Sequence, residues 1–457
     1  MVKTLLVNPD SQKIYGIGGQ SAFPLGLGYI AAVLEKYHNV KVIDVGAEKL
    51  SDDSLRKIVS GIDPKIVGIT SDTITFQRAI EIAKLVKQTN EEIVVVIGGA
   101  HSNALPAYPL RYNCFDISVY GEGERTAIEL WDRIERREPY EGIKGTAFRR
   151  KDKIIINPKR ELIENLDELP FPARHLFPMR KYGDESSLYI SPVYHIGTSR
   201  GCPFSCTFCS NNVVFGRKYR FRSAKNVVDE IELLVKTHKA KGIYFREDLF
   251  TVNRKRVIDI CSEIKERGLK FKWECESRVN TINEEMIRAM KGAGCELVWC
   301  GVESGSQEIL NYLNKEITLS QIKEAYSIFK KVGMKAGATF MIGIPGETMN
   351  DIYETINLAK SLKLEFAAFA IFTGYPTSPL YEYVRQNKLY EKEVSHGILI
   401  VKPDGFNREK LEKIQRYANR KTNRNMRRLL RYGFLEIKHG TLTLQKVIEG
   451  LRYLLGR

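Results

Sequence analysis

The chain has 457 residues, enough for two or three domains that each bury a core. Its 43% hydrophobic and 28% charged residues are typical of a folded globular protein and exclude a disordered or fibrous chain. The net charge of +16 is not concentrated in one arm, so it fits a solvated basic surface as well as a nucleic-acid or lipid partner. No apolar run approaches the roughly 18–20 residues of a membrane-spanning helix.

The first residues lead directly into an expected strand, without the pattern of a signal peptide. Eight cysteines without such a signal indicate a reducing compartment, where thiols stay free for metals. We therefore expect a cytoplasmic protein.

Residues 1–145 alternate short apolar runs with amphipathic stretches, the pattern of a doubly wound α/β domain with a parallel sheet. The expected strands are Thr4–Asn8, Val40–Asp44, Ile66–Ser71, Ile93–Gly98 and Ile117–Tyr120. The expected helices are Leu27–Lys36, Leu55–Gly61, Arg78–Gln88 and Arg125–Arg136. Such sheets bind ligands at the carboxyl ends of their strands. The candidate residues at these ends are Ser71, Thr73, Gly98, Gly99, Gly121 and Glu122.

Residues 146–192 are expected to form a linker, with a hairpin over Ala147–Asn157 followed by a proline-punctuated connector. Residues 193–400 then return to six strand–helix units, which predicts a partial (β/α)6 barrel with its chemistry at the carboxyl ends of the strands. The expected strands are Tyr194–Thr198, Gly242–Arg246, Phe271–Ser277, Leu297–Gly301, Ala336–Ile342 and Phe366–Phe372.

Three cysteines, Cys202, Cys206 and Cys209, follow the first barrel strand. Thiolates are the ligands that iron–sulfur clusters take, and a [4Fe–4S] cube normally takes four of them. Three cysteines therefore leave one iron open to another ligand. A structural zinc site pairs two short cysteine spacings, and a disulfide framework suits short secreted chains. The chain has neither pattern.

The Cys-x3-Cys-x2-Cys run, with the aromatic Phe208 before its last cysteine, resembles the signature of the radical S-adenosylmethionine superfamily. The strings Gly301–Gly305 and Met341–Thr348 resemble two further motifs of that superfamily. Other strings resemble the cobalamin-binding domain that precedes the barrel in many of these enzymes: Asn8-Pro9, Pro24–Tyr29, Val67–Thr70, Gly98–His101 and Gly121–Glu124. The resemblance covers residues 3–385.

This resemblance implies three cofactors: a [4Fe–4S] cluster on the three cysteines, S-adenosylmethionine and cobalamin. It also implies an electron donor such as ferredoxin or flavodoxin. Polar groups at the barrel strand ends are the expected contacts of S-adenosylmethionine, although each alone would also fit a surface ion pair. We expect its amine at Glu247 and Asp248, its carboxylate at Arg278, its ribose at Glu303 and Ser304, and its adenine at Gly343, Pro345 and Phe208.

One departure concerns the cobalt. Many cobalamin proteins ligate it through the histidine of an Asp-x-His-x-x-Gly loop, whereas this chain reads Asp10–Gly16 without a histidine. We therefore expect no histidine below the corrin, and we expect His101 to form a hydrogen bond within its own loop.

Residues 401–457 contain a basic helical stretch, Arg408–Arg431, and a more apolar one, Leu442–Leu455. Such a pair is able to lie on an anionic membrane or to bind RNA. We expect instead a helical cap on the barrel, with no nucleic-acid partner and at most a peripheral membrane contact.

The whole pattern predicts a cobalamin-dependent radical enzyme that methylates a weakly activated carbon of a small molecule, lipid or peptide. One alternative is a cobalamin-assisted cyclisation or oxidation without methyl transfer. Another is a non-catalytic cobalamin- or redox-sensing protein that binds nucleic acid. A methylthiolation enzyme fits less well, because the N-terminal domain offers Cys114 and no second set of cluster cysteines.

Overall fold

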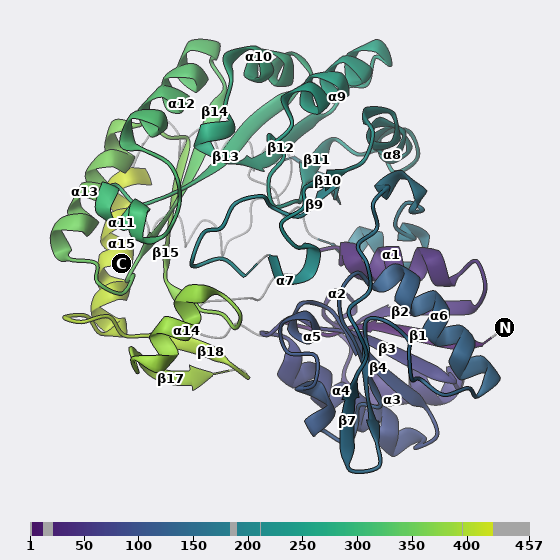
Figure 1. Cartoon of the computed structure of the whole chain (residues 1–457). Coiled ribbons are helices and arrows are strands. Elements are labelled where there is room, and N and C mark those ends of the chain that lie inside the picture. Colours follow the sequence, from purple (N-terminus) through teal and green to yellow (C-terminus); the bar gives the residue numbers. More distant parts are fainter. Residues whose placement is uncertain (1, 12–21, 183–189, 211, 395, 424–457) are drawn as a thin grey trace.

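The computed structural model describes residues 2–11, 22–182, 190–210, 212–394 and 396–423. Two sheets with their own helices make up most of it, one in the N-terminal part and one in the following part of the chain (Figure 1). In the described residues no helix has both the length and the apolar character that crossing a bilayer requires.

The N-terminal sheet has seven strands in the order β2-β1-β3-β4-β5-β6-β7. Its first five strands are parallel and lie close to the predicted ranges: β1 (Lys3–Asn8), β2 (Asn39–Asp44), β3 (Ile66–Thr70), β4 (Val94–Gly98) and β5 (Ile117–Val119). The strand order reverses between β1 and β3, and such switch points mark the ligand crevice of doubly wound sheets.

Helices cover both faces of this sheet. One apolar core lies under α3 (Asp52–Ile62) and α4 (Phe76–Thr89), and the other lies under α1 (Leu25–Leu34) and α6 (Gly123–Arg136). The short helices are α2 (Val45–Glu48), α5 (Ala100–Ala104) and the 3-10 turn η1 (Pro109–Arg111). The buried strands are nearly continuous apolar runs, as expected for a parallel sheet covered on both sides.

The predicted hairpin exists as β6 (Thr146–Arg150) and β7 (Lys153–Ile156), but it is part of the N-terminal sheet. Its strand β6 pairs antiparallel with β5, so the sheet continues into the range that we assigned to the linker. The rest of that connection contains three short turns, η2 (Leu166–Glu168), η3 (Arg174–Leu176) and η4 (Met179–Lys181).

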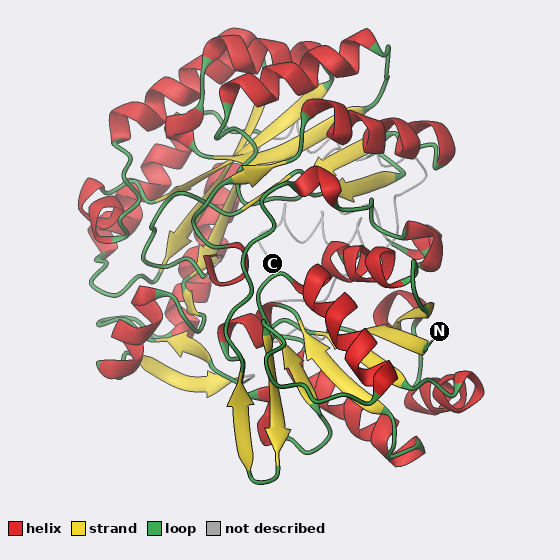
Figure 2. Ribbon diagram, turned by 45° about the vertical axis from the view of Figure 1, so that its right-hand side comes forward, coloured by secondary structure: helices red, strands yellow, loops and turns green. Residues whose placement is uncertain are grey.

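The barrel sheet has six parallel strands in the sequential order β8-β11-β12-β13-β14-β15. These are β8 (Val193–Ile196), β11 (Gly242–Phe245), β12 (Lys272–Ser277), β13 (Cys295–Glu303), β14 (Lys335–Ile342) and β15 (Phe366–Ile371). Figure 2 shows the strands on the inner side and the helices on the outer side of this incomplete barrel. The main apolar core fills the space between them.

Most barrel helices begin at a side chain that caps the first turn, which satisfies backbone N–H groups left without an intrahelical partner. For example, Thr318 and Gln321 form a capping box at the start of α12. The outer helices are α8 (Ala224–Thr237), α9 (Arg254–Glu266), α10 (Glu284–Gly292), α12 (Leu319–Val332) and α13 (Met349–Ser361). Shorter elements are α7 (Asn212–Phe215), α11 (Gln307–Tyr312), α14 (Pro379–Gln386) and η5 (Val279–Thr281).

A small antiparallel sheet, which the sequence did not predict, follows the barrel strands. It contains β16 (Thr373–Gly374), β18 (Ile398–Val401) and β17 (Tyr390–Val394). The basic helix is described as α15 (Arg408–Asn423), and the stretch Leu442–Leu455 lies outside the described residues.

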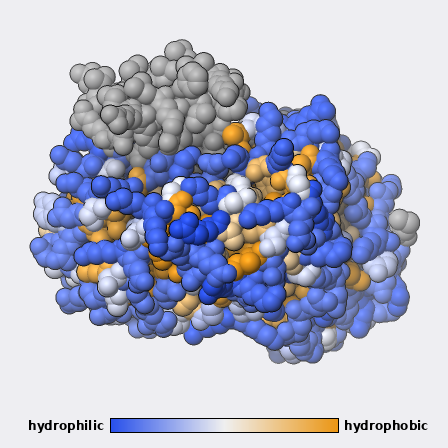
Figure 3. Space-filling model, turned by 90° about the horizontal axis from the view of Figure 1, so that it is seen from above, coloured by the Kyte–Doolittle hydropathy of each residue, from blue (hydrophilic) through white to orange (hydrophobic). Residues whose placement is uncertain are grey.

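Helix α15 covers the edge strand β15, in agreement with the expected cap. Amide side chains one helical turn apart bond to the strand backbone: Gln415 to the carbonyl of Phe369 at 2.7 Å, and Asn419 to its N–H at 3.2 Å. This covers an edge that would otherwise be able to pair with another strand. The face seen in Figure 3 is mostly hydrophilic, with small hydrophobic patches between charged side chains.

Candidate functional site

The three motif cysteines lie in one connection, here called the cysteine loop, between the short strands β9 (Ser199–Arg200) and β10 (Arg220–Phe221). All three cysteines are outside any disulfide bond and partly exposed. The loop is fixed against the barrel, because Thr207 donates its N–H to the carbonyl of Leu313 and accepts from the N–H of Leu380, both at 2.9 Å. Asn314 donates to the carbonyl of Ser205 at 3.1 Å.

The donor set fits an iron–sulfur cube. Among the described residues, no three His, Cys, Asp or Glu side chains converge as the ligands of a single ion do. A cube takes each thiolate at a different iron, so its ligands must surround it instead of meeting at one point. Three cysteines that form no disulfide and lie in one fixed loop after the first barrel strand are suited to such a cube.

A buried cation lies beside these thiols. Arg278, which follows β12, donates through Nη1 to the Cys206 sulfur at 3.2 Å, and its guanidinium lies 3.8 Å from the centroid of the Phe204 ring. The residue is 3% exposed, and its Nε and Nη2 atoms have no hydrogen-bond partner. Buried N–H groups are normally paired, so these two are available to an anion.

A second cation was missed by the sequence reasoning. The Nζ of Lys315 lies 2.8 Å from Oε1 of the predicted residue Glu303 and 5.6 Å from the centroid of the Phe208 ring. Glu303 has a φ of 69°, which is costly for a residue with a side chain and is typical of functional sites. Lys315 stands in an ordinary polar stretch after α11, so no sequence signal marked it.

Two of the predicted contact residues have protein partners in the structure. The Glu247 side chain is 1% exposed and accepts hydrogen bonds from Thr198 Oγ1 at 2.9 Å and Ser199 Oγ at 2.5 Å. The Ser304 hydroxyl is fully buried and is bonded to Thr355 Oγ1 at 3.2 Å. Both residues therefore fix the loops that precede or form the site, whereas we expected them to contact the amine and the ribose.

The turn after β14 has an acid at its centre. Glu347 accepts from the N–H of Gly343 at 2.6 Å and of Ile344 at 3.3 Å, which fixes the turn that contains Pro345. Burial raises the pKa of Glu347 to about 8, although these two N–H groups favour its charged form. Gly343 has a φ of 79°, so this position favours glycine.

The strand ends of the N-terminal sheet meet at one edge, as predicted. Ser71 donates its N–H to the carbonyl of Gly98 at 2.8 Å. A Cβ on Gly99 would lie 2.5 Å from the Ser71 carbonyl oxygen, so only glycine allows this close turn. His101 on α5 forms a hydrogen bond between its Nδ1 and Thr73 Oγ1 at 3.3 Å, but Thr73 lies in the turn after β3 and not in the loop of His101 itself. Burial lowers its pKa to about 3, so the ring is neutral.

Glu122, which we expected to contact the cofactor at this edge, has protein partners in the structure. Its carboxylate is bonded to Arg200 at 2.7 Å and Arg220 at 2.9 Å, at the base of the cysteine loop. The neighbouring turn residue Gly121 has a φ of 83° and donates its N–H to Asn103 on α5 at 2.6 Å. The turn therefore connects the N-terminal sheet to the base of the cysteine loop, a role that the sequence did not indicate.

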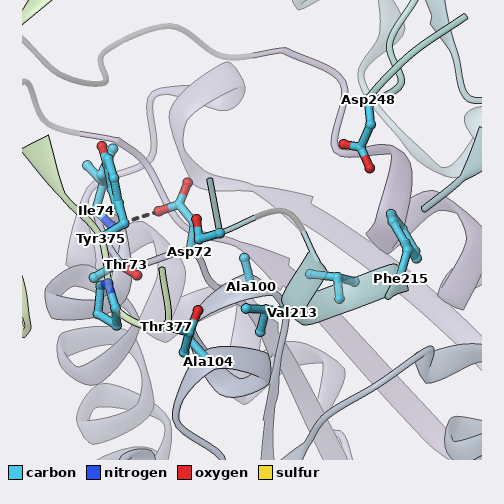
Figure 4. Close-up of a pocket in the computed structure, with 13 residues that line it drawn as sticks. Asp72, Thr73, Ile74, Ala100, Ala104, Val213, Phe215, Asp248, Tyr375 and Thr377 are labelled. Carbon is cyan, nitrogen blue, oxygen red and sulfur yellow. Dashed lines mark hydrogen bonds between the residues drawn. The ribbon is translucent and has the colours of Figure 1, made fainter. Parts of the chain in front are cut away.

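A cavity of about 260 Å³ lies where the two halves meet (Figure 4). The N-terminal edge contributes Asp72, Thr73, Ile74, Ala100 and Ala104; the cysteine loop contributes Ser210, Val213, Val214 and Phe215; the barrel side contributes Asp248, Tyr375, Pro376 and Thr377. Small side chains on α5 leave room for a flat ring, and no histidine lies among the described lining residues.

Comparisons with known proteins identify both halves. Residues 196–359 match the model of the radical SAM superfamily, and residues 18–130 match the model of the B12 binding domain. An uncharacterized methyltransferase of Pyrococcus horikoshii is 41% identical over 85% of this chain and 84% of its own length. The anaerobic magnesium-protoporphyrin IX monomethyl ester cyclase of Rubrivivax gelatinosus is 30% identical over 90% of this chain and 75% of its own. The cytidylyl-2-hydroxyethylphosphonate methyltransferase of Streptomyces wedmorensis is 30% identical over 92% of this chain and 90% of its own length.

Two solved structures share the fold. The radical S-adenosylmethionine methyltransferase TsrM from Kitasatospora setae, with cobalamin and a [4Fe-4S] cluster bound, has a TM-score of 0.71 and 18% identity over 91% of this chain and 81% of its own. The cobalamin-dependent radical enzyme OxsB, with aqua-cobalamin and S-adenosylmethionine bound, has a TM-score of 0.75 and 17% identity. The match covers 91% of this chain and 66% of OxsB. The chain therefore belongs to the radical S-adenosylmethionine superfamily, as a cobalamin-dependent enzyme whose cofactors are a [4Fe–4S] cluster, S-adenosylmethionine and cobalamin.

Proposed function

We propose that the enzyme transfers a methyl group from S-adenosylmethionine to a weakly activated carbon of a small molecule, lipid or peptide. One observation carries the proposal: the cavity is lined both by the cysteine loop and by the ligand edge of the N-terminal sheet. A substrate there would lie between the two cofactor sites. The named methyltransferases among the relatives support the same reaction.

When bound, cobalamin supplies a carrier for the methyl group and the cluster supplies the electron that cleaves a second S-adenosylmethionine to a 5′-deoxyadenosyl radical. The protein's own residues bind and position the reactants and exclude water, as in cofactor enzymes generally. The cavity wall supports this role, because Val213, Val214 and Phe215 of the cysteine loop line the cavity with apolar side chains. We further propose that the enzyme works in the cytoplasm and receives its electron from ferredoxin or flavodoxin.

The first half of the reaction tests this proposal without knowledge of the substrate. Anaerobic enzyme with a reconstituted cluster, hydroxocobalamin and a strong reductant is expected to convert S-adenosylmethionine to S-adenosylhomocysteine in an amount about equal to the bound cobalamin, which accepts one methyl group per molecule. Omitting hydroxocobalamin should abolish this product. Formation of 5′-deoxyadenosine without S-adenosylhomocysteine would contradict methyl transfer and would favour the cyclase-type reaction.

Replacing Arg278 by leucine is expected to weaken the binding of S-adenosylmethionine roughly 10- to 100-fold, since hydrogen bonds to charged groups contribute about 1.5–3 kcal/mol. The reason is that the two unpaired N–H groups beside Cys206 are proposed to bind the carboxylate of this molecule. Calorimetric titration of cluster-loaded protein measures the affinity, and an iron count confirms equal loading. Arg278→Lys should recover part of it; an unchanged affinity in Arg278→Leu would exclude this role.

A further inference from the structure

The base of the cysteine loop brings two like charges together. Strands β9 and β10 pair antiparallel, and their register places Arg200 directly opposite Arg220. Both side chains are buried, with exposures of 9% and 3%. Like charges opposite each other destabilise a strand pair, so this short ribbon needs an anion between its arginines.

The N-terminal domain supplies that anion. Glu122 accepts from Arg200 at 2.7 Å and from Arg220 at 2.9 Å, and Glu124 accepts from the second arm of Arg200 at 2.5 Å. The two carboxylates are 2% and 6% exposed. We call Glu122, Glu124, Arg200 and Arg220 the interdomain fork. Its two positive and two negative charges balance, and either half alone would leave buried charges without partners.

The fork is also connected to the cavity. On one side, Asn103 of α5 bonds to the backbone N–H of Gly121, next to Glu122, and α5 forms part of the cavity wall. On the other side, the Arg200 guanidinium lies 5.1 Å from the centroid of the Phe215 ring, and Arg220 donates to the Phe215 carbonyl at 3.3 Å. Phe215 belongs to the cysteine loop and lines the same cavity.

The loop itself depends on this base. Its first residue, Gly201, has a φ of 85°, and Cys202 donates its N–H to the carbonyl of Gly216 at 3.3 Å. The ends of the loop that carries the cluster cysteines are therefore held together by β9, β10 and the fork. The edge of the N-terminal sheet at which we expect cobalamin is thus connected to the base of the cysteine loop through a continuous set of contacts.

We propose that the interdomain fork couples the two cofactor sites, with Glu122 as the positioning residue. Cobalamin that orders α5 and the Gly121 turn holds Glu122 in place between the two arginines, and this stabilises the cysteine loop in its cluster-binding form. By linkage, a bound cluster strengthens cobalamin binding by the same factor. The inference rests on the two cofactors and does not require methyl transfer.

The test compares the dissociation constant of hydroxocobalamin for cluster-loaded and cluster-free full-length protein, measured by equilibrium dialysis under anaerobic conditions. For the wild type we expect the loaded form to bind roughly 5- to 100-fold more tightly, the usual size of a coupling between two sites. For Glu122→Gln, which keeps the size of the side chain but removes its charge, we expect this ratio to fall to about one. A purely structural role would weaken both affinities and leave the ratio unchanged.

Two more variants keep the test decisive. Glu124→Gln should lower the ratio by a smaller factor, because Arg200 still pairs with Glu122. If Glu122→Gln does not fold, Glu124→Gln provides the test in its place. Glu168→Gln removes an exposed ion pair with Arg125 at 3.2 Å, and the ratio of the two dissociation constants should stay at its wild-type value. The proposal would be overturned if the two forms of the wild type bound cobalamin equally well, or if Glu122→Gln kept the ratio of the wild type. It would also be overturned if Glu168→Gln lowered the ratio as much as Glu122→Gln. Failure of the methyl-transfer test would not change any of these ratios.

Discussion

A Cys206→Ala variant is expected to fold but to hold no four-iron cluster, and its cleavage of S-adenosylmethionine should fall to background. Only three thiols are offered by the cysteine loop, and removing one leaves two irons of the cube without a protein ligand. Iron content and the visible absorbance of anaerobically reconstituted protein measure the loss.

A buried cysteine elsewhere in the barrel provides the matched control. Cys261 on α9 is 1% exposed in the apolar core, where it is a small hydrophobic side chain. Cys261→Ala should therefore keep the cluster and the cleavage of S-adenosylmethionine. Cluster retention by Cys206→Ala, or cluster loss by Cys261→Ala, would show that the cysteine loop is not the ligand set.

A Glu230→Gln variant is expected to lose about 3–5 kcal/mol of stability, the usual effect of removing one partner of a buried ion pair. Glu230 on α8 is fully buried and is bonded to Arg174 at 2.6 Å and also to Arg222. The same arginines donate to the backbone at the end of β8, Arg174 to the His195 carbonyl at 2.8 Å and Arg222 to that of Gly197 at 3.1 Å. Unfolding in urea, followed by circular dichroism, measures the change.

This effect should depend on pH. Burial raises the pKa of Glu230, but Arg174 and Arg222 outweigh burial, so the pKa of the folded protein lies below the ordinary value of 4.5. The unfolded chain therefore binds more protons as the pH falls below 4.5, and the stabilisation by the carboxylate is lost there. The difference between wild type and Glu230→Gln should be full above this pH and shrink below it.

The control for this prediction lies two residues further along the same helix. Glu232 is 27% exposed and pairs with Arg267 at 2.8 Å, so Glu232→Gln removes an ion pair that water already screens. We expect its effect to be much smaller at every pH. Because its ion pairs also lower the pKa of Glu232, this small effect should shrink as the pH falls below 4.5. Equal effects of the two variants would mean that the Glu230 pair is no stronger than a surface pair.

Local patterns in the sequence were sufficient for the two-sheet fold and for proposing the cluster ligands. Strands and helices were predicted from the spacing of apolar side chains along the chain, and the cluster motif from the spacing of Cys202, Cys206 and Cys209. Both patterns lie within short stretches of sequence. The hairpin β6–β7 shows the limit. Its strands were predicted, but its pairing with β5 depends on contacts beyond the hairpin itself.

The sequence alone thus determined the cofactor class, because three closely spaced thiolates, small residues at strand ends and two runs of βα units are local features. Only the tertiary structure decided which charged residues pair with each other. Glu122 and Glu247 stand at strand ends like ligand contacts, yet the first is paired with an arginine 78 residues away and the second with hydroxyls 48 and 49 residues away. Lys315 joined the site in the same way, through a contact with Glu303 that no local pattern contains. A carboxylate at a strand end looks the same in sequence whether it binds a ligand or a buried counter-charge, because its partner is set by how distant segments pack.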